Sequence, residues 1–349
     1  MGLFSKLFGV QNGNVVQEYS FGAGLDPAIV QQCRKDAERG YAAAQAYLGE
    51  MYQLGHGVPQ DFTLAAHWSR KAADQGHVTA QYFMGLRYSF GRGVPEDVVE
   101  AAQWFLKAAI QGHAGAQCEM GVRYRCGYGV PQDFAQAIMW FHKAANQGDV
   151  SAQGQLGEMY FHGQRGVQDV AQAKHWSLLA ANQGDSTAQF MLGVMYAKGY
   201  GVSQDLAQAF HWYGKAADQG CPASQYSLGL MYEYGQGVPQ DCTTAEVWYR
   251  NAANQNYAAA QSALAVMYAN GIAVQQSYEL AVQWCRKAAN QGDARAQFNL
   301  GVMYQEGKGV PQDDTQAVEW YRKAADQGSP EAEFNLGLMP AYLTAKPVN

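Results

Sequence analysis

The sequence has little charge, and its charge is not of the kind that nucleic acids attract. Only 15% of its 349 residues are charged, and the formal net charge is −6. Nucleic-acid-binding proteins normally carry a basic excess, so the composition argues against that class of partner. Long apolar runs are also missing, since no run approaches the roughly 20 residues that span a bilayer. Even so, 48% of the residues are hydrophobic, which is enough for a large core.

The N-terminal stretch MGLFSKLFGVQNG lacks the apolar core of a signal peptide, so a cytoplasmic location is expected. It also misses a myristoylation motif, because Lys6 stands where that motif has Ser or Thr. A short helix here could touch a membrane or a partner through its apolar residues, which are Leu3, Phe4, Leu7 and Phe8. A frayed end is the simpler expectation.

What the sequence does have is a period of 36 residues. All eight tryptophans follow it without exception: Trp68, Trp104, Trp140, Trp176, Trp212, Trp248, Trp284 and Trp320. Ala65 and Tyr52 begin parallel series with the same spacing. A fixed period of this length indicates a repeat array, in which each copy is stabilised by stacking on its neighbours.

Each copy is predicted to form two helices. In YAAAQAYLGEMYQLG, Ala44, Leu48 and Tyr52 share one helical face, and a glycine ends the helix. Asp61 then takes the N-cap position of the second helix, FTLAAHWSRKAAD. Small residues such as Gly49 are expected to let the two helix axes approach closely, while the large rings fill the space beside them.

The predicted fold is an all-α, right-handed α/α superhelical solenoid of eight 36-residue helix-turn-helix repeats with flanking helices. Its expected parts are an N-terminal segment (1–25), a capping helix (26–40), eight repeats (41–328), and a truncated ninth repeat with a tail (329–349). The last helix is expected to expose Leu336, Leu338 and Met339, which makes end-to-end self-association plausible. Alternatively, AYLTAKPVN folds back as a cap.

The repeated pattern A-x-x-x-L-G-x-x-Y-x-x-G-x-G-V-x-x-D-x-x-x-A-x-x-W-x-x-x-A-A-x-x-G resembles the Sel1-like repeat family, α/α solenoids related to tetratricopeptide repeats. One copy reads Ala44, Leu48, Gly49, Tyr52, Gly55, Gly57, Val58, Asp61, Ala65, Trp68, Ala72, Ala73 and Gly76. The resemblance implies a protein-interaction scaffold, in bacteria often a signalling adaptor, a host-contact factor or an envelope-regulation protein. It implies no particular ligand, because the motif residues hold the solenoid together.

Copy seven departs most from the pattern. Its turn reads GIAVQQS, with Ala273 for a glycine and Ser277 for the capping aspartate. Ala265 and Asn256 also replace glycines in or before this copy. Losing a cap costs about 1 kcal/mol, so the junction of copies six and seven is expected to be the least stable.

Catalytic and metal-binding signatures are missing. The sequence has no G-x-S-x-G, no G-x-x-x-x-G-K-[ST], no H-E-x-x-H and no paired C-x-x-C. His175 and His211 share a repeat position, where stacked helices would hold them about 10 Å apart, too far for one metal ion. We therefore expect no catalytic residue, no metal and no cofactor. The six cysteines do not recur from copy to copy and are expected to be reduced.

Function is expected at the positions that vary, on the side of the first helix that lines a concave surface. The repeat position of Met51 becomes arginine in copies two and three, with aromatic and charged residues nearby. We predict that this group binds an acidic peptide, a carboxylate terminus or a phosphate, and its members are Phe83, Arg87, Phe90, Glu119, Arg123 and Arg125. The alternative is that these arginines are solvated, or pair with Glu119 and aspartates.

The same repeat position elsewhere forms a methionine row, which includes Met195, Met231 and Met267. Methionine-lined surfaces adapt to varied apolar partners, so the row is predicted to supply contact area in the groove. The alternative is that the row packs against the second helices.

The predicted function is therefore binding of a peptide or protein segment in a groove with an arginine end and a methionine end. The second hypothesis is a non-protein anionic ligand, such as a glycan or a lipid head group. An enzyme such as a hydrolase is less expected.

Overall fold

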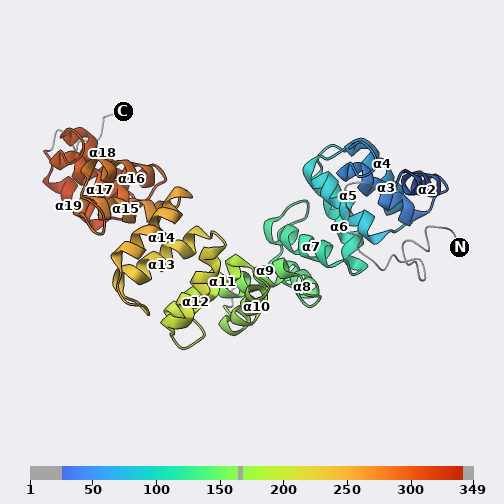
Figure 1. The fold of residues 1–349 in the computed structure, drawn as a ribbon, viewed down its shortest axis with the longest axis horizontal. Helices are drawn as coiled ribbons and strands as arrows, with labels where there is room; N and C mark the ends of the chain where they lie inside the picture. Colours follow the sequence, from blue (N-terminus) through green and yellow to red (C-terminus); the bar gives the residue numbers. More distant parts are fainter. Residues whose placement is uncertain (1–25, 164–167, 341–349) are drawn as a thin grey trace. The chain divides into compact units, whose positions relative to one another are not determined.

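The computed structural model describes residues 26–163 and 168–340, and every regular element in these stretches is an α-helix (Figure 1). The helices are α2 (Pro27–Glu38), α3 (Ala42–Leu54), α4 (Phe62–Asp74), α5 (Val78–Phe90), α6 (Val98–Ile110), α7 (Ala114–Cys126), α8 (Phe134–Ala145), α9 (Val150–His162), α10 (Val170–Asn182), α11 (Ser186–Lys198), α12 (Leu206–Asp218), α13 (Pro222–Tyr234), α14 (Cys242–Asn254), α15 (Ala258–Asn270), α16 (Tyr278–Asn290), α17 (Ala294–Glu306), α18 (Asp314–Ala325) and α19 (Pro330–Leu338).

The predicted all-α repeat solenoid is confirmed. A first helix alternates with a second helix of similar length, and α4 illustrates the packing of a second helix between two first helices, α3 and α5. The chain forms two compact units, Met1–Leu179 and Ala180–Asn349, with the boundary inside α10. The right-handed superhelical path stays a prediction.

The predicted helix caps are confirmed. The Asp61 carboxylate accepts hydrogen bonds from the backbone N–H groups of Thr63 and Leu64, both at 2.9 Å. Gly55 ends α3 in the left-handed conformation with φ 73°, and its N–H donates to the carbonyl of Met51. These contacts satisfy backbone groups that a helix end otherwise leaves without partners.

The close approach expected at Gly49 recurs along the array. At Gly85, a Cβ atom would lie only 2.7 Å from the ring of Phe105, and at Gly301 it would lie 2.6 Å from Tyr321. The ring of the second helix therefore occupies the space that a side chain on the first helix would need. Where the second helix carries Ser69 instead, the serine approaches Gly49 in the same way.

Two glutamines per copy, which the sequence analysis left unexplained, join neighbouring copies. Gln45 is buried; its amide nitrogen donates to the carbonyl of Ala37 in the preceding helix, and its oxygen accepts from Gln75 at 2.7 Å. The pair recurs as Gln81 with Gln111, and in further copies. Each buried amide thus has partners on both sides, which a buried polar group requires.

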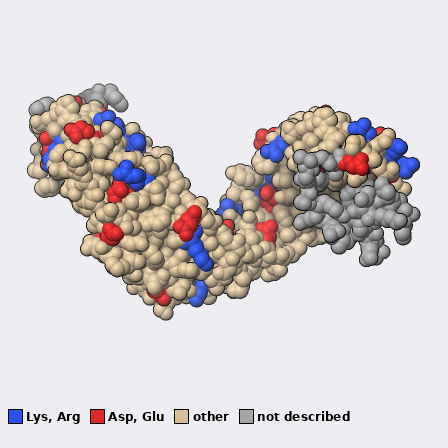
Figure 2. Space-filling model, viewed as in Figure 1, with Lys and Arg blue, Asp and Glu red and all other residues tan. Residues whose placement is uncertain are grey.

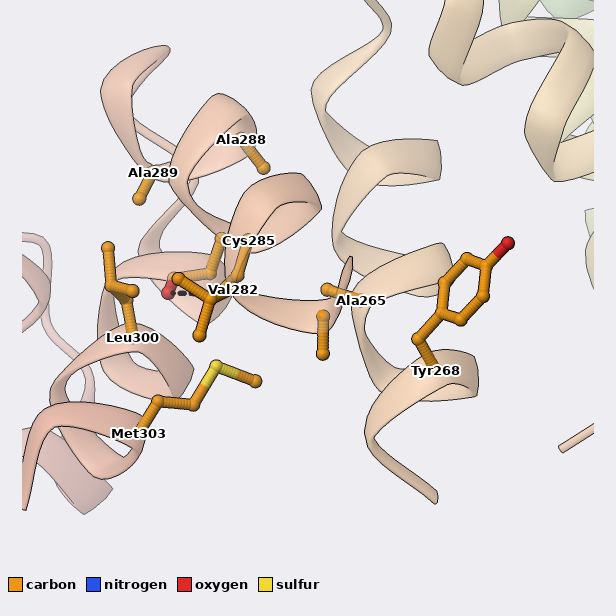
Figure 3. Close-up of a cluster of buried hydrophobic side chains, with 10 residues drawn as sticks. Ala265, Tyr268, Val282, Cys285, Ala288, Ala289, Leu300 and Met303 are labelled. Carbon is orange, nitrogen blue, oxygen red and sulfur yellow. Dashed lines mark hydrogen bonds between the residues drawn. The ribbon is translucent and has the colours of Figure 1, made fainter. Parts of the chain in front are cut away.

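Copy seven is better compensated than its sequence indicates. Its expected loss of a cap is wrong, because the hydroxyl of Ser277 accepts a hydrogen bond from the N–H of Leu280 at 3.2 Å. Ala265 fits because the facing residue of α16 is the small Cys285, and both side chains lie in the buried cluster of Figure 3. Asn256 and Ala273 adopt positive φ angles of 65° and 58°. Only Ala273 lacks a side chain that suits this conformation.

The end of the array differs in part from expectation. Leu338 is exposed, but Leu336 is half-buried and Met339 is buried, because α19 lays them against α18. Phe334 is the other exposed apolar residue of this helix. The tail that was expected to fold back, and the apolar residues Leu3, Phe4, Leu7 and Phe8, lie outside the described residues.

All six cysteines are free thiols, as the sequence analysis predicted. Two of them, at equivalent repeat positions, are fully buried: Cys33 donates to the carbonyl of Ala44, and Cys285 to that of Ala296. Burial raises the pKa of Cys33 to about 12, as it does for Cys285. These two thiols are packing residues rather than nucleophiles, since the reactive form of cysteine is the thiolate.

Candidate functional site

The variable residues gather on one surface, which we call the first-helix face. It consists of the accessible sides of the first helices, at the repeat positions of Tyr47, Glu50, Gln53 and Leu54. The motif residues at the positions of Ala44, Leu48 and Gly49 are buried between helices. On the first helices, a partner therefore meets residues that change from copy to copy, and the motif residues at these three positions are hidden from it.

The expectation that Arg87 and Arg123 form an accessible grip is wrong. Their exposed fractions are only 4% and 5%. Arg87 donates to the amide oxygen of Gln53 in the preceding copy at 2.8 Å. Arg123 donates to the carbonyl oxygens of Val98 and Tyr128 and to the hydroxyl of Ser89, and its guanidinium lies 4.7 Å from the ring centre of Phe105.

Both arginines are structural ties between copies two and three and their preceding copies. The alternative that they are solvated is equally wrong, because the first helix is covered on two sides, by the second helices before and after it. Burial lowers the pKa of Arg87 to about 10, with a smaller contribution from Arg92. The Nε atoms of Arg87 and Arg123 have no hydrogen-bond partner. A ligand carboxylate has no access to either guanidinium, because both side chains are buried between helices.

The other predicted residues of this group do reach the first-helix face. Phe90 is 63% exposed, and Phe83 is half-buried. Arg125 is engaged in an ion pair with Glu158 at 3.1 Å. Glu119 is half-buried, and burial raises its pKa, an effect that Arg123 partly offsets and Asp149 adds to.

The accessible charge at this face has both signs: Glu50 and Glu119 are carboxylates, and beside Phe90 the exposed Arg92 places its guanidinium 5.4 Å from the ring centre. Glu50 of copy one shares its repeat position with Leu86 of copy two. Burial raises the pKa of Glu50, and the nearby His56 lowers it to a smaller extent. Neither Glu50 nor Glu119 forms an ion pair with the described residues. The surface drawn in Figure 2 carries few charged side chains.

The methionine row is core. Met195, Met231 and Met267 are exposed by 0%, 3% and 2%, respectively, so the prediction that they line a groove is wrong. The alternative that the row packs against second helices is confirmed, since Met231 packs with Ala209 and Tyr213 of α12 and Met267 with Ala245 and Tyr249 of α14. The half-buried Val194, Leu230, Val266 and Val302, one position before each methionine, are the aliphatic residues that the face does offer.

A cleft on the first-helix face of the second unit went unnoticed in the sequence. It lies between α15 and α17 and has a volume of about 320 Å³. One wall is a stripe of α17 formed by Arg295, Asn299, Val302 and Glu306. The facing wall of α15 is made by Val266, Ala269 and Asn270. The signal for it lay in copy seven, whose first helix AAAQSALAVMYAN is unusually rich in small residues.

The charges of this cleft differ from those of the first unit. Arg295 is exposed and forms no ion pair with the described residues. At the other end, Lys308 pairs with Glu306 at 2.6 Å, so the two charges compensate. The cleft thus combines an aliphatic floor with one uncompensated cation.

Neither metal binding nor membrane crossing is indicated in the part of the chain that the structure describes. Residues 26–163 and 168–340 hold no group of three or more His, Cys, Asp or Glu side chains placed to bind a metal ion. Among the described helices, none is both long and apolar enough to cross a membrane.

Helix pairs of constant length, stacked through glycine–aromatic contacts and paired glutamines, define an α/α repeat solenoid. The chain belongs to the Sel1 repeat family. The Sel1 repeat matches residues 42–77, 78–113, 114–149, 150–185, 186–221, 222–257, 258–293 and 294–329. No curated protein matches the chain.

Two solved structures show the same architecture. A protective antigen present in uropathogenic Escherichia coli strains, which displays an SLR fold, is 39% identical with a TM-score of 0.79. The match covers 90% of this chain and 67% of that protein. A Sel1 repeat protein from Oxalobacter formigenes is 34% identical with a TM-score of 0.69, over 93% of this chain and 98% of that one. Sel1-repeat proteins generally act as protein-interaction scaffolds.

Proposed function

We propose that this protein is an interaction scaffold that binds a segment of a partner protein on its first-helix face. The observation that carries the proposal is the division of labour within each copy. On the first helices, the recurring residues at the positions of Ala44, Leu48 and Gly49 are buried and hold helices together, whereas residues that vary are accessible on one face. A binding surface needs individual side chains, and the accessible positions of the first helices carry different residues from copy to copy.

In the first unit, the partner segment is apolar with neutral or basic neighbours. Phe90 and Phe83 supply large apolar area, and aromatic residues often dominate binding energy at interfaces. Glu50 and Glu119 would gain from a cationic partner, since a nearby opposite charge compensates a half-buried carboxylate. The acidic partner expected from Arg87 and Arg123 is not proposed for this unit.

An adaptor role follows from this reading, because scaffolds of this family are built from non-catalytic repeats. The two structural relatives are proteins of bacteria, so we infer a bacterial adaptor. The cytoplasmic location expected from the sequence stays a prediction.

The test exchanges face residues for those that other copies carry at the same positions. Phe83→Ser introduces the residue type that copy six has at this position, Ser227. Phe90→Lys introduces the residue type that copy five has, Lys198, so the repeat accommodates both. We expect the double variant to fold normally and to lose proteins that co-purify with the wild-type chain. The control is Val99→Glu with Ile110→Asp, which introduces residues found at the same positions of second helices, Glu279 and Asp74.

Equal loss of partners in both double variants would contradict a site on the first-helix face. Unchanged co-purification in both would contradict a role for Phe83 and Phe90. Circular dichroism spectra and melting curves of the variants establish that differences in binding do not arise from unfolding.

A further inference from the structure

We propose that the cleft between α15 and α17 binds an extended peptide segment that places an acidic residue at Arg295 and small apolar side chains against Val266 and Val302. The inference rests on the proposed function and names the partner chemistry for one part of the first-helix face. It concerns copies seven and eight only, and both lie in the second unit.

The shape of the cleft suits an extended chain. Arg295, Asn299, Val302 and Glu306 follow one another at helical spacings along one stripe of α17. From the first of these residues to the last, the helix rises about 17 Å. An extended peptide advances about 3.3 Å per residue, so about five residues span this length.

On the α15 wall, copy seven combines the small Ala269 with the short Asn270, whereas copy five shares only the alanine, Ala197. Ala269 of α15 stands at the repeat position of Phe161 in α9 and of Glu233 in α13. Asn270 stands at the position of Tyr234. Either larger side chain of α13 at these positions would extend into the cleft, so Ala269 and Asn270 leave the cleft open.

The polar groups of the cleft have the chemistry of a peptide site. The guanidinium of Arg295 offers donors to a carboxylate, and it has no competing carboxylate among the described residues. Asn299 lies one turn further along α17, is half-buried, and forms no hydrogen bond within the described residues. Its amide can both donate to and accept from a peptide backbone.

The rest of the cleft explains the position of the acidic residue. Glu306 and Lys308 neutralise one another at the opposite end, beside Tyr278. Between the two ends, Val266, Ala269 and Val302 provide only apolar surface. A carboxylate is therefore favoured at the Arg295 end, and small aliphatic side chains are favoured in the middle.

The experiment is a selection of random seven-residue peptides displayed on phage against the immobilised full chain. We expect the selected peptides to share an Asp or Glu followed or preceded by small aliphatic residues. Binding of a labelled selected peptide is then measured by fluorescence anisotropy. Ala269→Phe, which copies Phe161 of α9, is expected to abolish binding by filling the cleft.

The charge variant tests the role of Arg295 separately. Arg295→Glu is expected to weaken binding of the acidic peptide at least about tenfold, the scale of one charge-assisted contact. A new selection against this variant is expected to replace Asp and Glu by Lys and Arg. The matched controls are Ala197→Phe, at the position of Ala269 in copy five, and Lys287→Glu, on the second helix of copy seven. Both should bind like wild type.

Three results would overturn the proposal. Selected peptides that bind equally to wild type, Ala269→Phe and Arg295→Glu would place peptide binding elsewhere and leave the scaffold function standing. If no peptide is selected, but the wild-type chain binds inorganic phosphate and Arg295→Glu does not, the cleft is an anion site rather than a peptide site. If no peptide is selected and Ala269→Phe still captures the same partners as wild type, the cleft is not the binding site. If the wild-type chain captures no protein partner at all, the proposed function itself is contradicted.

Discussion

At the scale of single residues, the same repeat position serves different chemistry in different copies. The position of Met51 is buried throughout, yet copies two and three fill it with Arg87 and Arg123. Arg123 has three hydrogen-bond acceptors around it, whereas Arg87 has one. A buried charge is tolerated only when its donors are satisfied, so the two arginines should differ in their contribution to stability.

Substituting each arginine by methionine, the residue of the other six complete copies, tests this difference. Arg123→Met is expected to lower the free energy of unfolding by about 1–3 kcal/mol, because it leaves buried acceptors without a donor. Arg87→Met is expected to leave it unchanged or raise it, since it removes an under-bonded charge. Chemical denaturation of the two variants measures both. Equal losses would contradict the structural distinction.

Ala273 offers a second test at this scale. Its φ of 58° is a conformation in which an alanine is disfavoured by roughly 1 kcal/mol, whereas the glycine of other copies adopts it freely. Ala273→Gly is therefore expected to raise the free energy of unfolding by about 1 kcal/mol. As a control, Asn256→Gly should not stabilise, because the Asn256 side chain accepts hydrogen bonds from Gln261 and Gln291. A decrease in stability for Ala273→Gly would refute this account of copy seven.

Glu119 predicts a pH dependence. Burial raises its pKa in the folded state above the ordinary value of 4.5, so its ionisation destabilises the fold as the pH rises through the folded pKa. Glu119→Gln should therefore raise the melting temperature at pH 7. The difference from wild type should shrink as the pH falls from the folded-state pKa towards 4.5 and vanish below it, where the carboxyl is protonated in both states. A difference that does not change with pH would show that burial of charge is not its cause.

At the scale of helices, the period predicted most of the fold because each repeated residue has one mechanical task. Ala44, Gly49 and Trp68 could be assigned to packing, since their spacing defines a face. How much of the first helix's circumference is buried could not be predicted. First helices such as α5 and α7 are packed on by two second helices, and the position of Met51 is buried there. A helical wheel shows which residues are neighbours, but not how many helices surround them.

The residue at the repeat position of Gly49 on a first helix faces the residue at the repeat position of Ser69 on the second helix, and this contact gives a test of helix packing. Seven first helices carry glycine opposite a serine or an aromatic ring, and α15 carries Ala265 opposite Cys285. Cys285→Tyr should destabilise the protein by about 1–3 kcal/mol through overpacking against the Ala265 methyl group. Adding Ala265→Gly gives α15 and α16 the same glycine–tyrosine pair as Gly301 and Tyr321. This second substitution should recover most of the lost stability.

A double-mutant cycle isolates this interaction. Residues in contact couple by about 0.5–3 kcal/mol, so the two substitutions should be strongly non-additive. If the changes in the free energy of unfolding simply add, the contact between residues 265 and 285 does not explain why Ala265 is found opposite Cys285.

At the scale of the whole molecule, the array separates stability from recognition. The repeated contacts are local and of the same kind in every copy, so the accessible residues are free to differ. Function on the accessible side of the first helices stays a prediction, while burial rules out several of the particular residues. Arg87, Arg123 and the methionines were chosen because they vary or stand in a row, but burial decides which residues a partner can touch. The cleft at Ala269 required knowing which small residues leave space rather than pack.

The most direct test of the account is site-specific photo-crosslinking in cells. A photoreactive phenylalanine analogue replaces either Phe90, which is 63% exposed on the first-helix face, or Ile110, which is 70% exposed on a second helix. Both belong to copy two, so they share expression, fold and surroundings. The account predicts a crosslinked protein partner from Phe90 and none from Ile110. Crosslinks from Ile110 alone, or equally from both positions, would contradict recognition by the first-helix face.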